Sequence, residues 1–300
     1  MVEIPGTCDT FGMSTSPSAG SRLRAAVERG PVALPGAFNA LAGRAIADAG
    51  FEGCYVSGAA MSVSAGVPDV GLLTLTEFAV EIRRIADASG LPVVADADTG
   101  FGEYEQALRT VVEYERAGAA GLHVEDQVFP KRCGHLDGKE LVPTEEMALK
   151  VEAMVSAKRD PGFLVIARTD ARGVTGMDDA IARANAYRAA GADAIFPEGL
   201  QSEEEFETFA KGSPGLLLAN MTEFGKTPFI SLDRFGELGY RLVIFPVSLL
   251  RLAMGEVVRS LGVLKETGSL ESLVERMQTR KELYATLGYE PGTPWKVRRS

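Results

Sequence analysis

The sequence predicts an α/β fold, and within that class a TIM (β/α)8 barrel with a helical extension at the carboxyl end. Eight short apolar runs recur along the chain, and each is followed by a segment of helical pattern. The runs are continuously apolar, as expected for parallel strands with both faces buried. The eight units span roughly 250 residues, which is the usual size of a TIM barrel. The main alternative is a doubly wound open sheet.

The predicted strands are short apolar runs bounded by glycine, proline or polar residues. The first run, over residues 32–34, is the weakest of the eight. The others cover residues 54–57, 92–96, 121–125, 163–168, 194–197, 216–220 and 241–245.

The predicted helices alternate with these strands, and several are followed by glycine, which commonly ends a helix. Thr76 is predicted to cap one helix, whereas the helix at Thr144 lacks the Glu or Gln that completes a capping box. One helix, over residues 21–29, precedes the first strand. The helices after the strands cover residues 37–49, 76–88, 104–117, 144–158, 178–190, 202–210, 232–238 and 248–265.

Three segments are expected. Residues 1–20 are rich in Ser, Thr, Gly and Pro and are predicted to be a flexible N-terminal segment. Residues 21–266 form the predicted barrel domain, and residues 267–300 form a C-terminal helical extension and tail. A helical stretch over 270–287 carries apolar residues, so the extension is expected to pack on another surface, such as a neighbouring subunit.

Charge and cysteine content exclude several classes of protein. The 31 basic and 41 acidic residues give a formal net charge of −10, which argues against a nucleic-acid or anionic-membrane partner. Cys8, Cys54 and Cys133 show no zinc-binding spacing and fit reduced thiols. The sequence shows neither a secretory signal nor a membrane-spanning run, so a cytoplasmic location is expected.

A candidate reactive thiol lies in the stretch from Lys131 to His135. Cys133 is preceded by Lys131 and Arg132 and followed by Gly134 and His135. Nearby positive charge stabilises a thiolate, and the glycine allows close approach to a ligand. A polar surface loop that happens to contain cysteine is the alternative.

Polar residues follow the predicted strands, where a TIM barrel carries its active site. Any one could serve as a helix cap, but so many around one rim favour a functional site. The residues at these strand ends are Ser57, Asp96, Asp98, Glu125, Asp126, Arg168, Asp170, Glu198 and Asn220.

Asp96 and Asp98 are the predicted metal ligands, because hard oxygen donors without several histidines favour Mg²⁺ or Mn²⁺ over zinc. Glu125 and Glu198 are candidate additional ligands, and the alternative for Asp98 is a helix cap. His123 lies in an apolar strand and is expected to be a core histidine.

The arginines are candidate carboxylate-binding groups. Arg168 lies in an apolar strand, so its guanidinium needs an anionic partner, either protein or substrate. Arg251 and Arg280 lie on helical segments, where a solvated helix face is the alternative.

Six motifs together resemble the isocitrate lyase/phosphoenolpyruvate mutase superfamily, and within it they are most similar to 2-methylisocitrate lyases. The resemblance extends from about residue 21 to residue 289, and the thiol stretch combined with the paired aspartates is its most specific part. The motifs occupy residues 96–102, 121–127, 131–135, 167–171, 196–198 and 220–228.

The resemblance implies a Mg²⁺-dependent TIM barrel in a homotetramer whose subunits exchange a C-terminal helix. It implies cleavage of 2-methylisocitrate to pyruvate and succinate in the methylcitrate cycle of propionate breakdown. The expected partner is therefore a small di- or tricarboxylate. Related acids, namely isocitrate, 2,3-dimethylmalate and oxaloacetate, are the alternative substrates, and a non-catalytic carboxylate-binding protein is a further alternative.

The resemblance also implies roles for individual residues. Asp96 and Asp98 would hold the metal, and Asp69 matches a position that is important in the family. The charge changes of the cleavage reaction separately suggest Cys133 as the general acid and Tyr55 or Glu125 as the base, with His135 as a further catalytic candidate. The family often has glycine where Ala59 stands. The implied substrate-binding residues are Ser57, Gly58, Ala59, Cys133, Gly134, Arg168, Glu198, Asn220, Met221, Thr222, Arg251 and Arg280.

Overall fold

The computed structural model describes residues 16–132, 134 and 138–295, and within these it has an α/β fold in which every paired strand is parallel. The predicted flexible segment falls largely on residues 1–15, outside the described residues, as do Cys133 and His135. The strands are β1 (Val32–Pro35), β2 (Cys54–Val56), β3 (Val93–Asp96), β4 (Gly121–Glu125), β5 (Leu164–Thr169), β6 (Ala194–Pro197), β7 (Leu218–Asn220) and β8 (Leu242–Phe245).

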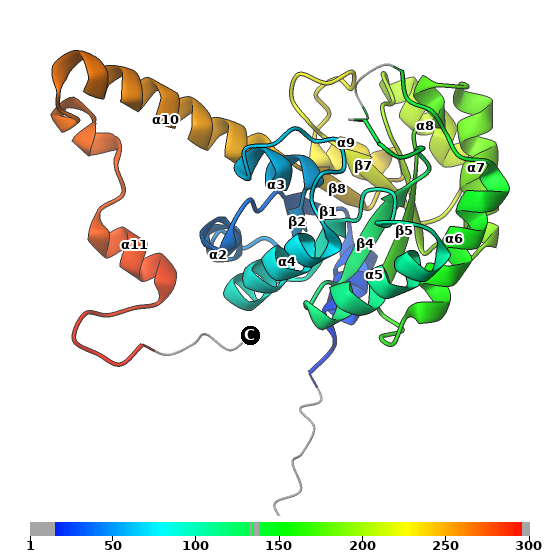
Figure 1. Cartoon of the computed structure of the whole chain (residues 1–300), viewed down its shortest axis with the longest axis horizontal. Helices are drawn as coiled ribbons and strands as arrows, with labels where there is room; N and C mark the ends of the chain where they lie inside the picture. The colour runs from blue at the N-terminus through cyan, green and yellow to red at the C-terminus, as the bar shows by residue number, and fades with distance from the viewer. Residues whose placement is uncertain (1–15, 133, 135–137, 296–300) are drawn as a thin grey trace, which may run out of the picture.

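The helices alternate with the strands and lie around them (Figure 1). The weak prediction for the first strand is confirmed. The helices are α1 (Ala19–Arg29), α2 (Ala40–Asp48), α3 (Gly58–Ser64), α4 (Leu75–Ser89), α5 (Tyr104–Arg116), α6 (Thr144–Ala157), η1 (Ala171–Gly173), α7 (Met177–Ala189), α8 (Glu203–Gly212), α9 (Leu232–Glu237), α10 (Ser248–Thr267), η2 (Glu271–Arg276) and α11 (Arg280–Leu287).

The strands form two parallel sheets, and in the larger one each strand lies beside the next strand of the chain. One sheet has the order β2-β3-β4-β5-β6 and the other has the order β1-β8-β7. Single parallel bridges, Gly36 to Tyr55 and Ile195 to Leu217, connect β1 with β2 and β6 with β7. Because all strands run the same way, their carboxyl ends share one edge, and the register sets Glu125 of β4 beside Arg168 of β5.

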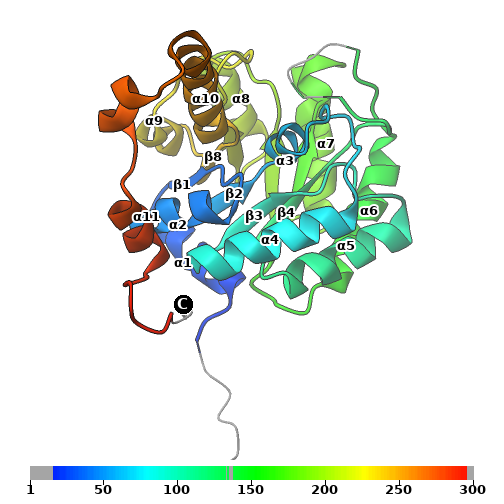
Figure 2. The same cartoon turned by 60° about the vertical axis from the view of Figure 1, so that its left-hand side comes forward.

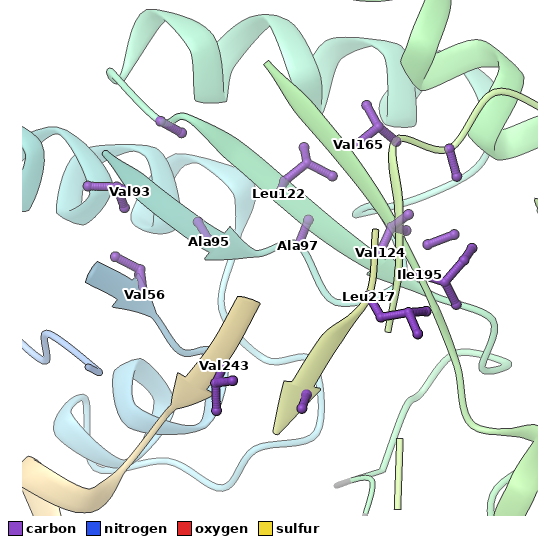
Figure 3. Packing of buried hydrophobic residues seen from close by; sticks show 14 of the residues in the cluster. Val56, Val93, Ala95, Ala97, Leu122, Val124, Val165, Ile195, Leu217 and Val243 are labelled. Atoms are coloured by element: carbon purple, nitrogen blue, oxygen red, sulfur yellow. The ribbon is translucent and has the colours of Figure 1, made fainter. Parts of the chain in front are cut away.

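Both faces of the strands are buried, as the continuously apolar runs predict. Val93 and Ala95 belong to a large apolar cluster with helix residues, and Figure 3 shows them among the strand residues of this cluster. Val94, between them, belongs to a second cluster that joins strand residues with Leu23 and Ala26 of α1. An alternating strand would expose one of these two faces to water.

The prediction that Thr76 caps a helix is wrong. Helix α4 begins at Leu75, and Thr74 is its N-cap, with a capping box to Glu77. The N3 position relative to Thr74 holds the required glutamate, so the correct signal was present two residues earlier. Helix α6 lacks a side-chain cap, as expected. The short helix α3, capped by Ser57, was not predicted.

An arm formed by α10, η2 and α11, which includes the C-terminal extension, projects from the strands (Figures 1 and 2). The single helical stretch predicted over residues 270–287 is wrong, because the backbone is extended at Met277 and α11 begins only after Thr279. Helix α11 contacts α2, where Arg44 Nη1 donates to Thr286 O at 3.3 Å. Within the described residues, no helix has both the length and the apolar character needed to cross a membrane.

Candidate active site

A cavity of about 270 Å³ opens at the carboxyl ends of the strands. Asp96 ends β3, Asn220 ends β7, and Glu198 directly follows β6, so separate strands deliver polar groups to it. Eleven of the predicted site residues line it: Tyr55, Ser57, Ala59, Asp69, Asp96, Gly134, Arg168, Glu198, Asn220, Thr222 and Arg251. Its wall also includes Lys131, Arg132, Phe196, Glu223, Phe224, Gly225, Ile244, Pro246 and Val247.

Asp96 and Asp98 lie together where the chain turns after β3. Asp96 Oδ1 accepts a hydrogen bond from Asp98 N at 3.0 Å, and Asp96 Oδ2 accepts one from Gly58 N at 3.1 Å. Asp98 has a positive φ of 45°, a conformation that aspartate tolerates better than most residues. A Cβ on Gly58 would lie 2.8 Å from Asp96 Oδ2, so only glycine allows this approach. Two backbone N–H groups therefore fix the Asp96 carboxylate.

The Lys131 side chain is buried among carboxylates. Its Nζ lies 2.9 Å from Asp98 Oδ1 and also forms an ion pair with Asp69. Burial alone would lower the pKa of Lys131. The nearby carboxylates of Glu125, Asp96, Asp98 and Asp69 outweigh burial and raise this pKa above its ordinary value, so the ammonium keeps its charge. The sequence suggested that Lys131 serves the neighbouring thiol, whereas its observed partners are these carboxylates.

The two aspartates have different proton affinities. Burial raises the pKa of Asp96, but His123, Lys131 and Arg168 together bring it below its ordinary value. Burial and the negative charge of Asp96 raise the pKa of Asp98 to about 6. A cation placed between them would favour the ionised form of both.

The donor set fits a hard divalent cation. Asp96 and Asp98 offer carboxylate oxygens, and Glu125 Oε1 is buried without a hydrogen-bond partner among the described residues. The ammonium of Lys131 beside Asp98 shows that this cluster attracts positive charge. Within the same residues, no three His, Cys, Asp or Glu side chains converge on one ion position.

His123 is a buried histidine, as predicted, and it lies directly beside the site. Its Nε2 is 2.7 Å from the Tyr55 hydroxyl, and its Nδ1 is 3.7 Å from Asp96 Oδ1. Burial lowers the pKa of His123 to about 4, so the ring is neutral at physiological pH. Burial and the charge of Asp96 raise the pKa of Tyr55 well above its ordinary value, so the phenol holds its proton.

Arg168 has the anionic partners that its burial requires. Its Nε lies 2.9 Å from Asp170 Oδ2 and 3.2 Å from Glu125 Oε2, and its Nη1 lies 3.3 Å from Glu198 Oε2. The guanidinium also lies over the Phe196 ring, 5.1 Å from its centroid. Glu125 and Glu198, proposed as additional metal ligands, are thus both paired with this arginine.

Arg251 joins the site from α10 and contacts the loop after β7. Its Nη1 donates to Thr222 Oγ1 at 3.2 Å and to the Glu223 carbonyl at 2.6 Å. The interpretation of Arg251 as a solvated helix residue is therefore incomplete, because the side chain is partly exposed but lines the cavity.

Two other expected substrate contacts lie elsewhere in the chain. Arg280 begins α11 and lines a separate surface hollow with Tyr284 and Tyr289, so within one chain it does not reach the cavity. Met221 is buried, and its sulfur accepts a hydrogen bond from Ile230 N, so it supports the loop rather than lining the cavity.

Lys139, a buried lysine in the loop after β4, was not predicted from the sequence. Its Nζ donates to the Gly134 carbonyl and, at 2.8 Å, to Asp170 Oδ1. No local pattern identifies such a residue, because its partners include a side chain 31 residues away.

Comparison with known proteins identifies the family. Residues 23–264 match the family model described as phosphoenolpyruvate phosphomutase. The chain belongs to this family. It is 57% identical to the probable 2-methylisocitrate lyase 1 of Corynebacterium glutamicum, over 86% of this chain and 85% of that protein. It is 49% identical to the 2-methylisocitrate lyase of Bacillus subtilis, over 85% of this chain and 84% of that protein.

Solved structures of phosphoenolpyruvate phosphomutase family relatives share the fold. The 2,3-dimethylmalate lyase structure in its trigonal crystal form has a TM-score of 0.85 and 36% identity, covering 91% of this chain and 92% of that one. Phosphonopyruvate hydrolase in complex with oxalate and Mg²⁺ has a TM-score of 0.82 and 31% identity, covering 90% and 95% of the two chains. Both structures match 90% or more of this chain, so they support an α/β fold for nearly all of it.

Proposed function

We propose that this enzyme is a 2-methylisocitrate lyase, which cleaves a carbon–carbon bond of 2-methylisocitrate to give pyruvate and succinate. The observation that carries the proposal is one cavity lined by Asp96 of the buried aspartate pair and by the guanidinium groups of Arg168 and Arg251. A site for a hydroxylated tricarboxylate needs carboxylates that can hold a metal ion on one side, and positively charged groups that bind the substrate's own carboxylates on the other. The similarity to 2-methylisocitrate lyases of two bacteria supports the same activity.

Asp96 and Asp98 would hold Mg²⁺, and Mn²⁺ could substitute for it. The hard oxygen donors support this assignment. The related phosphonopyruvate hydrolase, whose solved structure is a complex with oxalate and Mg²⁺, supports it as well. When bound, Mg²⁺ polarises the 2-hydroxy-carboxylate part of the substrate.

The chain's own residues would bind the substrate and transfer its protons. Arg168 and Arg251 would hold the succinyl carboxylates and stabilise negative charge as the bond breaks. Asn220 and Thr222 line the same cavity and would orient the substrate. Cys133 would then protonate the carbanion that becomes succinate.

The base that takes the hydroxyl proton has two candidates. Tyr55 lines the cavity, but its raised pKa keeps the phenol protonated, which suits a hydrogen-bond donor. Burial raises the pKa of Glu125 well above its ordinary value, which favours the protonated carboxyl group over the carboxylate that a base requires, and Glu125 is not among the residues lining the cavity. Asp69 and His135 would support the acid and base.

A related substrate is the second candidate, because a structural relative is a 2,3-dimethylmalate lyase. Phe196 and Pro246 line the cavity and would contact the extra methyl group of 2-methylisocitrate. One methyl group contributes only about 1–3 kcal/mol of discrimination. Slow cleavage of isocitrate is therefore expected alongside the main reaction.

A pyruvate-release assay tests the function. We expect pyruvate from 2-methylisocitrate, no turnover after EDTA treatment, and restored turnover with added Mg²⁺. Cys133→Ala is expected to lower kcat by about 10²- to 10⁴-fold, the usual effect of removing a general acid. Normal turnover by that variant would refute the role of Cys133. Faster cleavage of isocitrate, followed as glyoxylate release, or of 2,3-dimethylmalate, followed as pyruvate release, would refute the substrate.

We further propose that residues 21–266 form one closed TIM barrel. The parallel bridges at Gly36–Tyr55 and Ile195–Leu217 support closure, since they link the two sheets at both gaps. Ala37 N donates to Tyr55 O at 2.8 Å and Ile195 N to Leu216 O at 3.1 Å. Both amides should exchange with solvent deuterium as slowly as those inside β4, and rapid exchange would indicate open edges.

Residues 267–300 would form an extension exchanged between subunits of a homotetramer. Helix α10, which leads into this extension and projects with it, supports the exchange, because Leu250 is its one buried residue while Leu252, Val258 and Leu261 are 70%, 64% and 58% exposed. Exposed apolar area of this kind marks an interaction surface. Arg280 would then reach the site of a neighbouring subunit.

The assembly is tested by sedimentation. We expect the wild-type protein to sediment as a tetramer, and the Val258→Asp/Leu261→Asp double variant to sediment as smaller species, because charged groups cannot be buried unpaired. The single substitution Lys211→Ala, on the exposed surface of α8, serves as a control that keeps the tetramer. A monomeric wild-type protein would refute the exchange.

A further inference from the structure

Lys139 has the contacts of a group that holds backbone in a set position. Its side chain is 4% exposed, although it belongs to a polar loop. Nζ donates to the Gly134 carbonyl and, at 2.8 Å, to Asp170 Oδ1. Burying an ammonium without such partners is energetically costly. The buried position of Lys139 therefore depends on its contacts with Gly134 and Asp170.

Gly134 is packed directly against the carboxylate-binding side of the cavity. A Cβ at Gly134 would lie 2.4 Å from Arg168 Nη2 and 2.4 Å from Glu198 Cγ. The Gly134 backbone therefore rests on these two side chains. Gly134 is also bonded directly to Cys133, the residue assigned as general acid.

Asp170 connects Lys139 to Arg168. Its Oδ2 accepts a hydrogen bond from Arg168 Nε at 2.9 Å. Its Oδ1 accepts one from Arg168 Nη2 at 3.2 Å and one from Lys139 Nζ at 2.8 Å. Burial raises the pKa of Asp170, but Arg168 and Lys139 lower it to about 2, so the carboxylate stays ionised. Asp126 Oδ1 accepts from Asp170 N at 2.9 Å and fixes its backbone. One rigid carboxylate thus orients two cations.

We propose that Lys139 is a positioning residue for the lyase reaction, which fixes the Gly134 backbone against Arg168, next in sequence to the residue assigned as proton donor. The inference rests on the proposed function, since it assumes that Cys133 is the proton donor. A lysine that only stabilises the loop would affect folding without affecting the reaction at Cys133.

The test compares Lys139→Met and Lys139→Arg with Lys158→Met in the full chain. Lys158 is a matched control, because its Nζ pairs with Asp193 Oδ2 at 2.9 Å and its side chain is only 13% exposed, but Asp193 precedes β6 at the opposite end of the strands. Three properties are measured: the melting temperature, kcat and KM for 2-methylisocitrate, and the rate of Cys133 alkylation by iodoacetamide, located by mass spectrometry. Cys54 does not interfere, since burial raises its pKa to about 12.

We expect Lys139→Met to lower kcat about 10- to 100-fold with little change in KM, because a misplacement of about 1 Å has effects of this size. Its Cys133 alkylation rate should differ several-fold from the wild type, Lys139→Arg should recover part of kcat, and Lys158→Met should change only the melting temperature. Equal kcat and equal alkylation rates in the two methionine variants would overturn the proposal. If the wild-type enzyme releases no pyruvate, the proposed function fails, while the alkylation rates still decide whether Lys139 positions Cys133.

Discussion

Replacing Asp96 with asparagine is expected to lower turnover of 2-methylisocitrate by about 10³-fold, equivalent to about 4 kcal/mol of transition-state stabilisation. The substitution removes one negative charge and one acceptor oxygen from the aspartate pair, while the shape of the side chain stays almost the same. Asp96 uses both oxygens, one for Asp98 N and one for Gly58 N, so the amide would leave one of these donors without an acceptor. The remaining carboxylate of Asp98, whose pKa burial raises, would be a single charged ligand and a weak site on its own.

Binding of Mn²⁺, followed by electron paramagnetic resonance, separates loss of the metal from loss of chemistry. The Asp96→Asn variant should bind Mn²⁺ at least about tenfold more weakly than the wild type, since one of two charged ligands is lost. Asp193→Asn is the control, because Asp193 is a partly buried carboxylate with two cationic partners at the other end of the strands. Undiminished Mn²⁺ binding by Asp96→Asn would show that the metal is held elsewhere.

The sequence predicted the fold well because its signals are local. Continuous apolar runs identify buried strands, and the residue after each run lies at the same edge once the strands are parallel. The strand ends predicted in this way include Asp96, Arg168 and Asn220, and the structure confirms that all three line one cavity. The helix α3 escaped prediction because seven residues are too few for a helical period to stand out.

Long-range partners could not be predicted. Proximity in sequence assigned Lys131 to the neighbouring thiol, but the fold brings it to Asp69, 62 residues earlier in the chain. Ion pairs between distant parts of a chain follow no fixed spacing in the sequence, so which of the many carboxylates pairs with Lys131 depends on the folded geometry. The same reason applies to Arg280, whose helix lies beside α2 in this chain and which lines a surface hollow separate from the cavity.

Substituting alanine for Gly134 is expected to lower kcat by about 10²- to 10³-fold while leaving the melting temperature within about 2 °C of the wild type. The added Cβ would lie 2.4 Å from Arg168 Nη2, and this guanidinium cannot easily move, because Asp170, Glu125 and Glu198 hold it from three sides. The loop backbone must therefore shift, and it carries Cys133 with it. Gly30→Ala is the matched control, since a Cβ there has no heavy atom within 4 Å among the described residues. If Gly134→Ala kept full activity, close packing of Gly134 on Arg168 would not be needed for catalysis, and the fixed geometry proposed for the proton donor would be wrong.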